Sequence, residues 1–161
     1  MVGYADADYA NDADDRKSYS GYCYFLFNDS APVSYSSKKQ SLVAQSTMES
    51  ETIALSHAAK EGIWLRHLCR NLGIFGEQSP PVPTTFIINS DSDSALKAIR
   101  NPVFHARTKH FDVRHHFIRD IASKGEVTMG FVPGEDNPAD IFTEGLERVK
   151  HTAALRLLHM A

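Results

Sequence analysis

The sequence predicts an α/β domain built on a five-stranded mixed sheet with helices on its faces. Three candidate strands lie within the first 36 residues and are separated by turns, so we expect an antiparallel meander. Beyond residue 46, amphipathic helices alternate with short apolar strands, a pattern typical of parallel pairing. The chain has 161 residues, of which 42% are hydrophobic and 23% charged, and this composition suits one globular domain with a buried core.

The elements are expected in the order βββαβααβα. Residues 19–27 give the clearest strand signal because they are rich in aromatic side chains. Ser46 or Thr47 is expected to cap a helix that runs to about Leu72, where Gly73 ends it. The other predicted elements are strands at 2–9, 31–36, 84–90 and 126–132, helices at 92–100, 106–123, 139–145 and 149–160, and a proline-containing loop at 76–83.

Composition and charge exclude several classes of protein. The net charge is -3, so any nucleic acid must be bound by a local basic patch rather than by the whole surface. The two cysteines, Cys23 and Cys69, form no CxxC pair, which argues against a disulfide framework and a zinc knuckle. No apolar run is long enough to span a bilayer. We therefore expect an intracellular, non-secreted protein, with the cytoplasm and the nucleus both open.

Four acids stand where a carboxylate is unfavourable unless it is paired or bound to a cation. Asp6 lies inside the first predicted strand, and Glu51 heads the apolar stripe of the first helix. Asp91 ends an apolar strand, and Asp140 lies in the first turn of a late helix. Each alone has an ordinary explanation, such as a helix cap. Together they can converge at one end of the sheet, and such a cluster requires divalent cations.

A run of bases is the second feature. The stretch from Leu96 to Arg119 holds six lysines and arginines, four histidines and one acid. A solvent-facing surface is the ordinary explanation of such a run. The histidine spacing matches no zinc pattern, so we do not expect a zinc site there.

Several blocks follow one another along the sequence, among them residues 3–10 (GYADADYA), 35–40 (YSSKKQ), 101–110 (NPVFHARTKH) and 139–143 (ADIFT). In composition and order these blocks resemble the ribonuclease H domain of copia-type retrotransposon polyproteins. The resemblance implies a ribonuclease H-like fold and a single domain over residues 1–161, cut from a longer polyprotein. It also implies hydrolysis of the RNA strand of RNA–DNA hybrids by two Mg²⁺ ions, for which Mn²⁺ substitutes.

The resemblance assigns a role to each of the four acids. It implies that Asp6 bridges both ions and that Asp91 and Asp140 complete the site beside the attacking water. Glu51 then serves the leaving-group side and contacts the 2′-hydroxyl that distinguishes RNA from DNA. The implied partners are the hybrid and an upstream reverse transcriptase, the implied products carry 5′-phosphates, and the isolated domain is expected to be monomeric. A phosphate track is expected from Lys38, Lys39, Arg107, Lys109 and Arg114.

Two alternatives stay open. The chain can be a catalytically impaired relic that serves as a packing or nucleic-acid-binding module of a reverse transcriptase. An integrase or resolvase is the other, although it requires a different order and spacing of acids. The loop at 133–138 has no histidine, unlike that of cellular and retroviral ribonucleases H, and this departure puts the catalytic rate in doubt. Retention of all four acids favours the enzyme.

Overall fold

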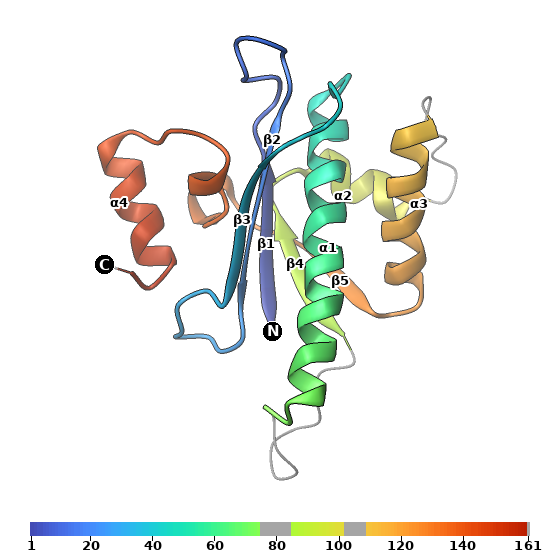
Figure 1. Cartoon of the computed structure of the whole chain (residues 1–161), viewed down its shortest axis with the longest axis vertical. Coiled ribbons are helices and arrows are strands. Elements are labelled where there is room, and N and C mark those ends of the chain that lie inside the picture. The colour runs from blue at the N-terminus through green and yellow to red at the C-terminus, as the bar shows by residue number, and fades with distance from the viewer. Residues whose placement is uncertain (75–84, 102–108, 161) are drawn as a thin grey trace.

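The computed structural model describes residues 1–74, 85–101 and 109–160, except for the side chains of residues 109–112. A five-stranded sheet with the order β3-β2-β1-β4-β5 forms its centre, and helices lie on both sides of it (Figure 1). The strands are β1 (Val2–Ala7), β2 (Tyr19–Phe25), β3 (Ser34–Lys39), β4 (Phe86–Ser90) and β5 (Val127–Phe131).

The sheet is mixed, as the sequence predicts. β2 pairs antiparallel with both β1 and β3, whereas β4 pairs parallel with both β1 and β5. The central strand β1 therefore has an antiparallel neighbour on one side and a parallel neighbour on the other. The predicted fold class is confirmed.

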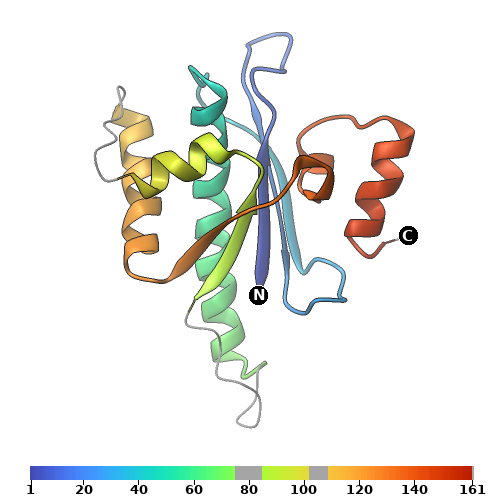
Figure 2. The same cartoon turned by 180° about the vertical axis from the view of Figure 1, so that it is seen from behind.

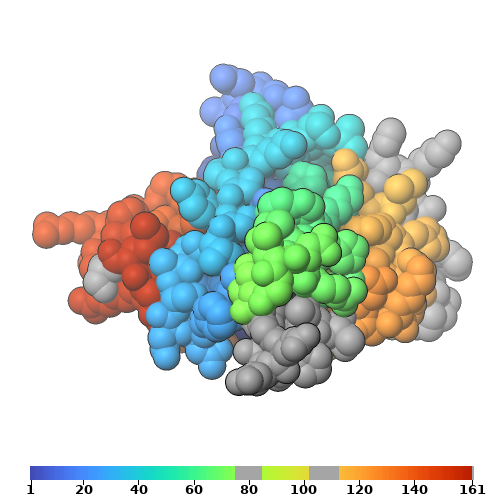
Figure 3. All heavy atoms as spheres, turned by 60° about the horizontal axis from the view of Figure 1, so that its bottom comes forward, coloured from blue at the N-terminus to red at the C-terminus, as the bar shows by residue number. Residues whose placement is uncertain are grey.

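One face of the sheet is covered by α1 (Thr47–Asn71), α2 (Asp93–Arg100) and α3 (Lys109–Ser123). Their apolar side chains join those of the strands in one core, which includes Leu55 and Ile118. Seen from the bottom of Figure 1, α1 lies between the β2–β3 connection and α3 (Figure 3). No helix within the described ranges is long and apolar enough to cross a membrane.

The opposite face of β1 and β2 is covered by C-terminal elements (Figure 2). They are a short 3₁₀ turn, η2 (Asp140–Phe142), and the helix α4 (Arg148–Leu157). Cys23, Phe25 and Leu158 form a second, smaller core beneath them. A further 3₁₀ turn, η1 (Gly134–Asp136), follows β5. The chain thus returns to β2 after β5, which brings residue 140 close to the first strand.

A glycine allows α1 to lie close to the sheet. A Cβ atom at Gly62 would come within 2.3 Å of Phe86 Cε2 and 2.6 Å of Tyr24 Oη. The Tyr24 hydroxyl donates to the Ala58 carbonyl at 2.6 Å, one turn earlier in the helix. Because these contacts fix α1 against β2 and β4, the start of the helix is held over the end of β1.

Several predicted boundaries are wrong. β3 covers residues 34–39 instead of 31–36, because Pro32 has no N–H to donate to a ladder. The helix predicted at 139–145 is only the turn η2, in which the Thr143 N–H donates to the Asp140 carbonyl at 3.0 Å. The strands predicted at 2–9 and 19–27 end at Ala7 and Phe25. The loop at 76–83 and the start of the helix predicted at 106 lie outside the described residues.

Candidate metal centre

The parallel register of β1 and β4 brings Asp6 and Asp91 to the same level. Tyr4 pairs with Asn89, and extending this register by two residues sets Asp91 opposite Asp6. Asp6 is the second-to-last residue of β1 and is only 9% exposed, and Asp91 directly follows β4. Two carboxylates from adjacent strands therefore lie at one edge of the sheet.

Glu51 reaches this edge from the start of α1. Ser46 caps the helix by accepting a backbone N–H of the first turn, as predicted. The buried Gln40 fixes this end of the helix, because its Nε2 donates to Ser20 Oγ at 2.8 Å and to the Ser50 carbonyl at 3.0 Å. Ser20 lies on β2, so the amide ties the residue before Glu51 to the sheet. Glu51 is 5% exposed.

Asp140 is carried by the segment that crosses β2. The buried Asn137 anchors this segment, since its Nδ2 donates to the Ala5 carbonyl at 3.3 Å and its Oδ1 accepts an N–H two residues on. Gly21, which pairs with Asp6, leaves room for the crossing. A Cβ atom there would lie 2.9 Å from a backbone oxygen of the segment. These contacts hold Asp140 against the strand that neighbours β1.

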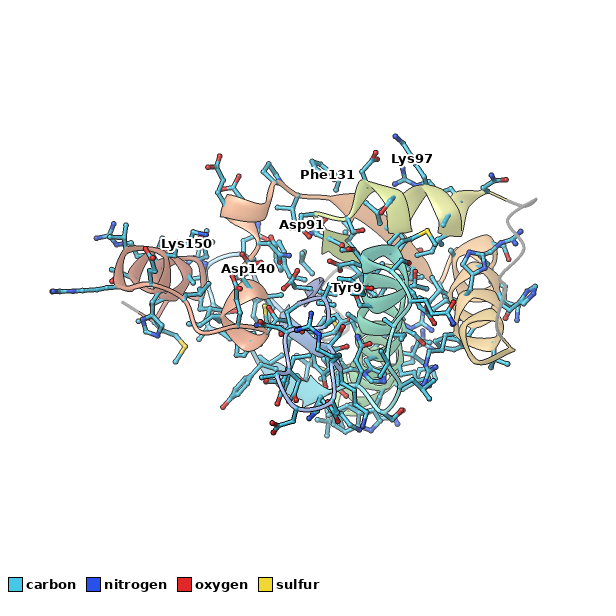
Figure 4. The ribbon with its side chains drawn as sticks, turned by 90° about the horizontal axis from the view of Figure 1, so that it is seen from above. Tyr9, Asp91, Lys97, Phe131, Asp140 and Lys150 are labelled. Atoms are coloured by element: carbon cyan, nitrogen blue, oxygen red, sulfur yellow. The ribbon has the colours of Figure 1, made fainter. Side chains whose placement is uncertain are left out.

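Three of the four acids meet closely. Asp6, Glu51 and Asp91 each offer a carboxylate oxygen, and these three atoms lie within 4.8 Å of one another. Asp140 lies outside this group of three and is half-buried. Figure 4 looks down on this end of the molecule and shows Asp91 and Asp140 near the middle of the view. The four predicted acids therefore share one end of the sheet.

Burial raises the pKa of every one of these carboxyls, and the charges of the neighbouring acids raise it further for Glu51, Asp6 and Asp140. Burial, followed by the charges of the other three acids, raises the pKa of Glu51 from its usual 4.5 to about 10. Burial is also the largest cause for Asp6, whose pKa rises to about 6, and for Asp140, whose pKa rises to about 7. It raises the pKa of Asp91 as well. These directions are those expected where ionised carboxylates need a positive charge between them.

The donor set suits a hard divalent cation. All four candidate ligands are carboxylates, and Mg²⁺ and Mn²⁺ prefer oxygen ligands. Glu51 Oε2 is buried and accepts no hydrogen bond from the described residues. Leaving such an atom without a partner is unfavourable. A cation at this position would satisfy it, so the residues present fit a divalent metal.

Three other acids, Asp8, Glu49 and Asp93, each lie two residues from a candidate metal ligand, but they bond to other groups. Asp8 accepts from the Tyr19 N–H, Glu49 accepts from the Gln45 N–H at 2.8 Å, and Asp93 forms an ion pair with Lys97 at 2.5 Å.

The predicted phosphate track is only partly described. Lys38 is exposed at the end of β3, and Arg114 is half-buried on α3. Arg107 lies outside the described residues, and so does the side chain of Lys109. That these residues bind a hybrid stays a prediction.

Lys39 differs from its neighbour. Its Nζ lies 2.7 Å from Asp12 Oδ2 and 3.0 Å from Asp15 Oδ1, both in the β1–β2 connection. The lysine is therefore held by two acids that the sequence pattern did not connect with it. A phosphate must compete with these acids for the same charge.

Two residues beside the acids were not predicted. Thr143 Oγ1 donates to Asp6 Oδ2 at 2.5 Å. Lys150 of α4 and Asp140, both labelled in Figure 4, line one cavity of about 350 Å³. Thr143 closes the block at 139–143, so the motif offered a signal for it. Nothing in the sequence pattern distinguished Lys150 from a surface lysine.

The sequence is similar to segments of known retrotransposon polyproteins. The chain is 39% identical over 160 residues to the retrovirus-related Pol polyprotein from transposon TNT 1-94 of Nicotiana tabacum, covering 99% of this chain and 11% of that protein. It is 37% identical over 149 residues to that from transposon RE2 of Arabidopsis thaliana, covering 92% and 10%. The chain thus spans about a tenth of the length of these curated relatives. No protein-family model matches it.

Solved structures agree on the fold. LC11-RNase H1, solved in complex with an RNA/DNA hybrid, is similar with a TM-score of 0.57 and 14% identity, covering 88% of this chain and 92% of that one. The chain therefore has the fold of ribonuclease H domains. It is homologous to a segment of the Pol polyproteins of plant retrotransposons, and the resemblance to copia-type elements is confirmed.

Proposed function

We propose that this chain is a ribonuclease H domain, an endonuclease that hydrolyses the RNA strand of RNA–DNA hybrids. The convergence of Asp6, Glu51 and Asp91, with a buried oxygen of Glu51 that accepts no hydrogen bond from any described residue, is the observation that supports this most strongly. The fold shared with LC11-RNase H1 and the homology to Pol polyproteins favour the same activity.

In this proposal the four acids hold two Mg²⁺ ions. The bound ions would activate a water and stabilise charge on the leaving 3′ oxygen. Asp6 would be shared by both ions, as the resemblance implies, since it lies on the central strand between β4, which leads to Asp91, and β2, which the Asp140 segment crosses. Glu51 faces them from α1. Its place at the start of the helix suits the additional contact with the 2′-hydroxyl of the RNA.

The substrate is expected to cross this end of the sheet. Hybrid phosphates would be neutralised by bases around the acids, among them Lys38 and Arg114. Because the homologues are Pol polyproteins, we propose that the domain, residues 1–161, works beside the reverse transcriptase of the same polyprotein. No residue of this chain specifies a base sequence in the proposal, since phosphate contacts position without specifying.

Incubation with four labelled substrates tests the proposal. These are an RNA–DNA hybrid, single-stranded RNA, an RNA duplex and a DNA duplex, each with Mg²⁺, Mn²⁺ or EDTA. We expect cleavage of RNA in the hybrid alone, with 5′-phosphate and 3′-hydroxyl ends, and none in EDTA. The Asp91→Asn variant, purified identically, reports any contaminating nuclease. Equal cutting of single-stranded RNA would refute the assignment, and binding without cleavage in either metal would favour the impaired relic.

A further inference from the structure

Thr143 contacts two of the four acids. Its hydroxyl donates to Asp6 Oδ2 at 2.5 Å and lies 2.9 Å from the backbone carbonyl oxygen of Asp140. The residue is 6% exposed, so water does not compete freely for this hydroxyl. Hydrogen bonds to an ionised carboxylate are short and about twice as strong as neutral ones.

Apolar packing carries the threonine to this position. Phe142 and Ile141 pack against the core around Cys23, and the Tyr35 ring stacks on Phe142 with centroids 5.5 Å apart. A Cβ atom at Gly21 would meet Thr143 Cγ2 at 2.8 Å, so the glycine is required for this close approach. The turn is therefore pressed onto β2, and its hydroxyl has little freedom to move.

Two donors fix the orientation of the Asp6 carboxylate. The Thr143 hydroxyl occupies one side of Oδ2, and the Ala7 backbone N–H also bonds this carboxyl. Because these donors prevent the carboxylate from rotating, its remaining lone pairs point in a fixed direction and can bind a cation there. Because the same hydroxyl reaches the Asp140 backbone, Thr143 also fixes the spacing between the acid on β1 and the acid on η2.

We propose that Thr143 is a positioning residue of the metal site, which holds Asp6 in the orientation that receives a divalent cation and keeps Asp140 beside it. The inference rests on the proposed function only in requiring that the acids bind metal. Residues that orient metal ligands typically change metal affinity or activity by about 10–100-fold when they are replaced. Thr143 acts through Asp6 and is not itself a ligand in this proposal.

Three variants test the inference. Thr143→Val keeps the shape and removes the hydroxyl, Thr143→Ser keeps the hydroxyl, and Thr152→Val is the control. Thr152 is exposed on α4, where its hydroxyl donates to the Arg148 carbonyl of the same helix. Calorimetric titration with Mn²⁺, without nucleic acid, gives the metal affinity. Hydrolysis of hybrid at increasing Mg²⁺ gives kcat, KM and the metal requirement.

The hydroxyl is expected to matter through the metal. Thr143→Val should weaken Mn²⁺ binding about tenfold and lower kcat by about 10–100-fold. KM for the hybrid at saturating metal should stay the same. Thr143→Ser and Thr152→Val should resemble the wild type. Should Thr143→Val fail to fold, Thr143→Ala provides the variant without a hydroxyl and without added bulk.

Two results would overturn the inference. One is unchanged Mn²⁺ affinity and Mg²⁺ requirement in Thr143→Val. The other is equal impairment of Thr143→Ser and Thr143→Val, which would assign the effect to packing. Failure of the proposed function is distinguishable from both results. If the wild type binds Mn²⁺ but cleaves no hybrid, the nuclease activity is refuted. If Thr143→Val then binds Mn²⁺ more weakly than the wild type, the positioning role is still supported.

Discussion

The helix α1 buries charge at both ends, and the two ends solve the problem differently. Near its C-terminal end, Arg66 is 7% exposed and its Nη2 lies 2.6 Å from Glu126 Oε2. The guanidinium also lies 5.8 Å from the centre of the Phe86 ring. Glu51 lies near the N-terminal end, about 22 Å away along the helix. Its carboxylate is close to those of Asp6 and Asp91, which carry the same charge.

The difference separates structure from function. Arg66 receives an opposite charge from the chain itself, so this pair joins α1 to the start of β5 and has no need of a ligand. Glu51 and the neighbouring acids carry the same charge and repel one another. All of them can be ionised together only if a cation from outside the chain binds between them. A buried charge that its own chain does not compensate therefore indicates a functional site more strongly than burial alone.

Removing an acid should have the largest effect, a loss of activity without a loss of stability. Asp6→Asn or Asp91→Asn should lower hybrid cleavage on the order of 1000-fold, which corresponds to about 4 kcal/mol of barrier. The melting temperature in EDTA should stay unchanged or rise, because one repelling charge is lost. Cleavage assays and thermal unfolding on the same samples check both. Retained activity with a large loss of melting temperature would make these acids structural.

Removing Arg66 should do the reverse. Arg66→Ala leaves Glu126 without its partner at a half-buried position and removes the contact with Phe86. The free energy of unfolding should fall by about 2–3 kcal/mol, below the full value for a buried pair because Glu126 is partly solvated. The kcat at a temperature where the variant is folded should not change. Urea unfolding measures the loss, and Lys124→Ala, which breaks the exposed pair with Asp120, is the control and should have no measurable effect.

An unchanged stability of Arg66→Ala would remove the contrast between the two ends of α1. It would mean that the ion pair contributes nothing beyond what solvation of the separate groups provides.

The acid cluster should also make the metal-free protein less stable as pH rises. The pKa of Asp6 is about 6 in the folded chain against a usual 3.8, so the folded state holds this proton more tightly than the unfolded chain does. The resulting stabilisation is complete below about pH 4 and is lost as pH rises through 6. Relative to Asp6→Asn, the wild type in EDTA should lose on the order of 2 kcal/mol between pH 4 and pH 8.

Comparison with Asp6→Asn and addition of Mg²⁺ make the pH dependence of stability specific for Asp6. Subtracting Asp6→Asn cancels histidines such as His57, whose pKa is lowered by burial and nearby bases and which acts in the opposite direction. Added Mg²⁺ at pH 8 should restore the stability of the wild type and leave Asp6→Asn less affected. Parallel pH profiles for the two proteins would show that burial and the neighbouring acids do not raise the pKa of Asp6 in the folded chain.

The fold class and the position of the four acids at one end of the sheet could be predicted from the sequence, because each signal is local; that these acids bind metal stays a prediction. An acid inside an apolar strand or at the head of an apolar helical stripe is visible without knowing what packs against it. The block at 139–143 contains Thr143, but its contact with Asp6 was not predictable, because it joins residues 137 apart and depends on the bare backbone of Gly21. The same holds for Lys39, since its two acidic partners lie across a strand pairing that the pattern leaves unspecified.

The smallest effects are expected from the two lysines at the end of β3, and they differ from each other. Lys38 is exposed and makes no ion pair with the described residues, whereas Lys39 must leave Asp12 and Asp15 before it can neutralise a phosphate. If the hybrid passes here, Lys38→Ala should weaken binding for every sequence alike and reduce the salt slope by about 1. Lys39→Ala should reduce it by less, because its charge is already compensated.

Titration of the Asp91→Asn variant with hybrid at several salt concentrations separates the two lysines. That background prevents cleavage during the measurement, and Lys124→Ala, at the far end of α3, serves as the control. A larger loss for Lys39→Ala than for Lys38→Ala would mean that the hybrid displaces the acids of the β1–β2 connection, so the ion pairs are a resting arrangement. No change in either variant would remove both lysines from the phosphate track and leave the bases of α3 to carry it.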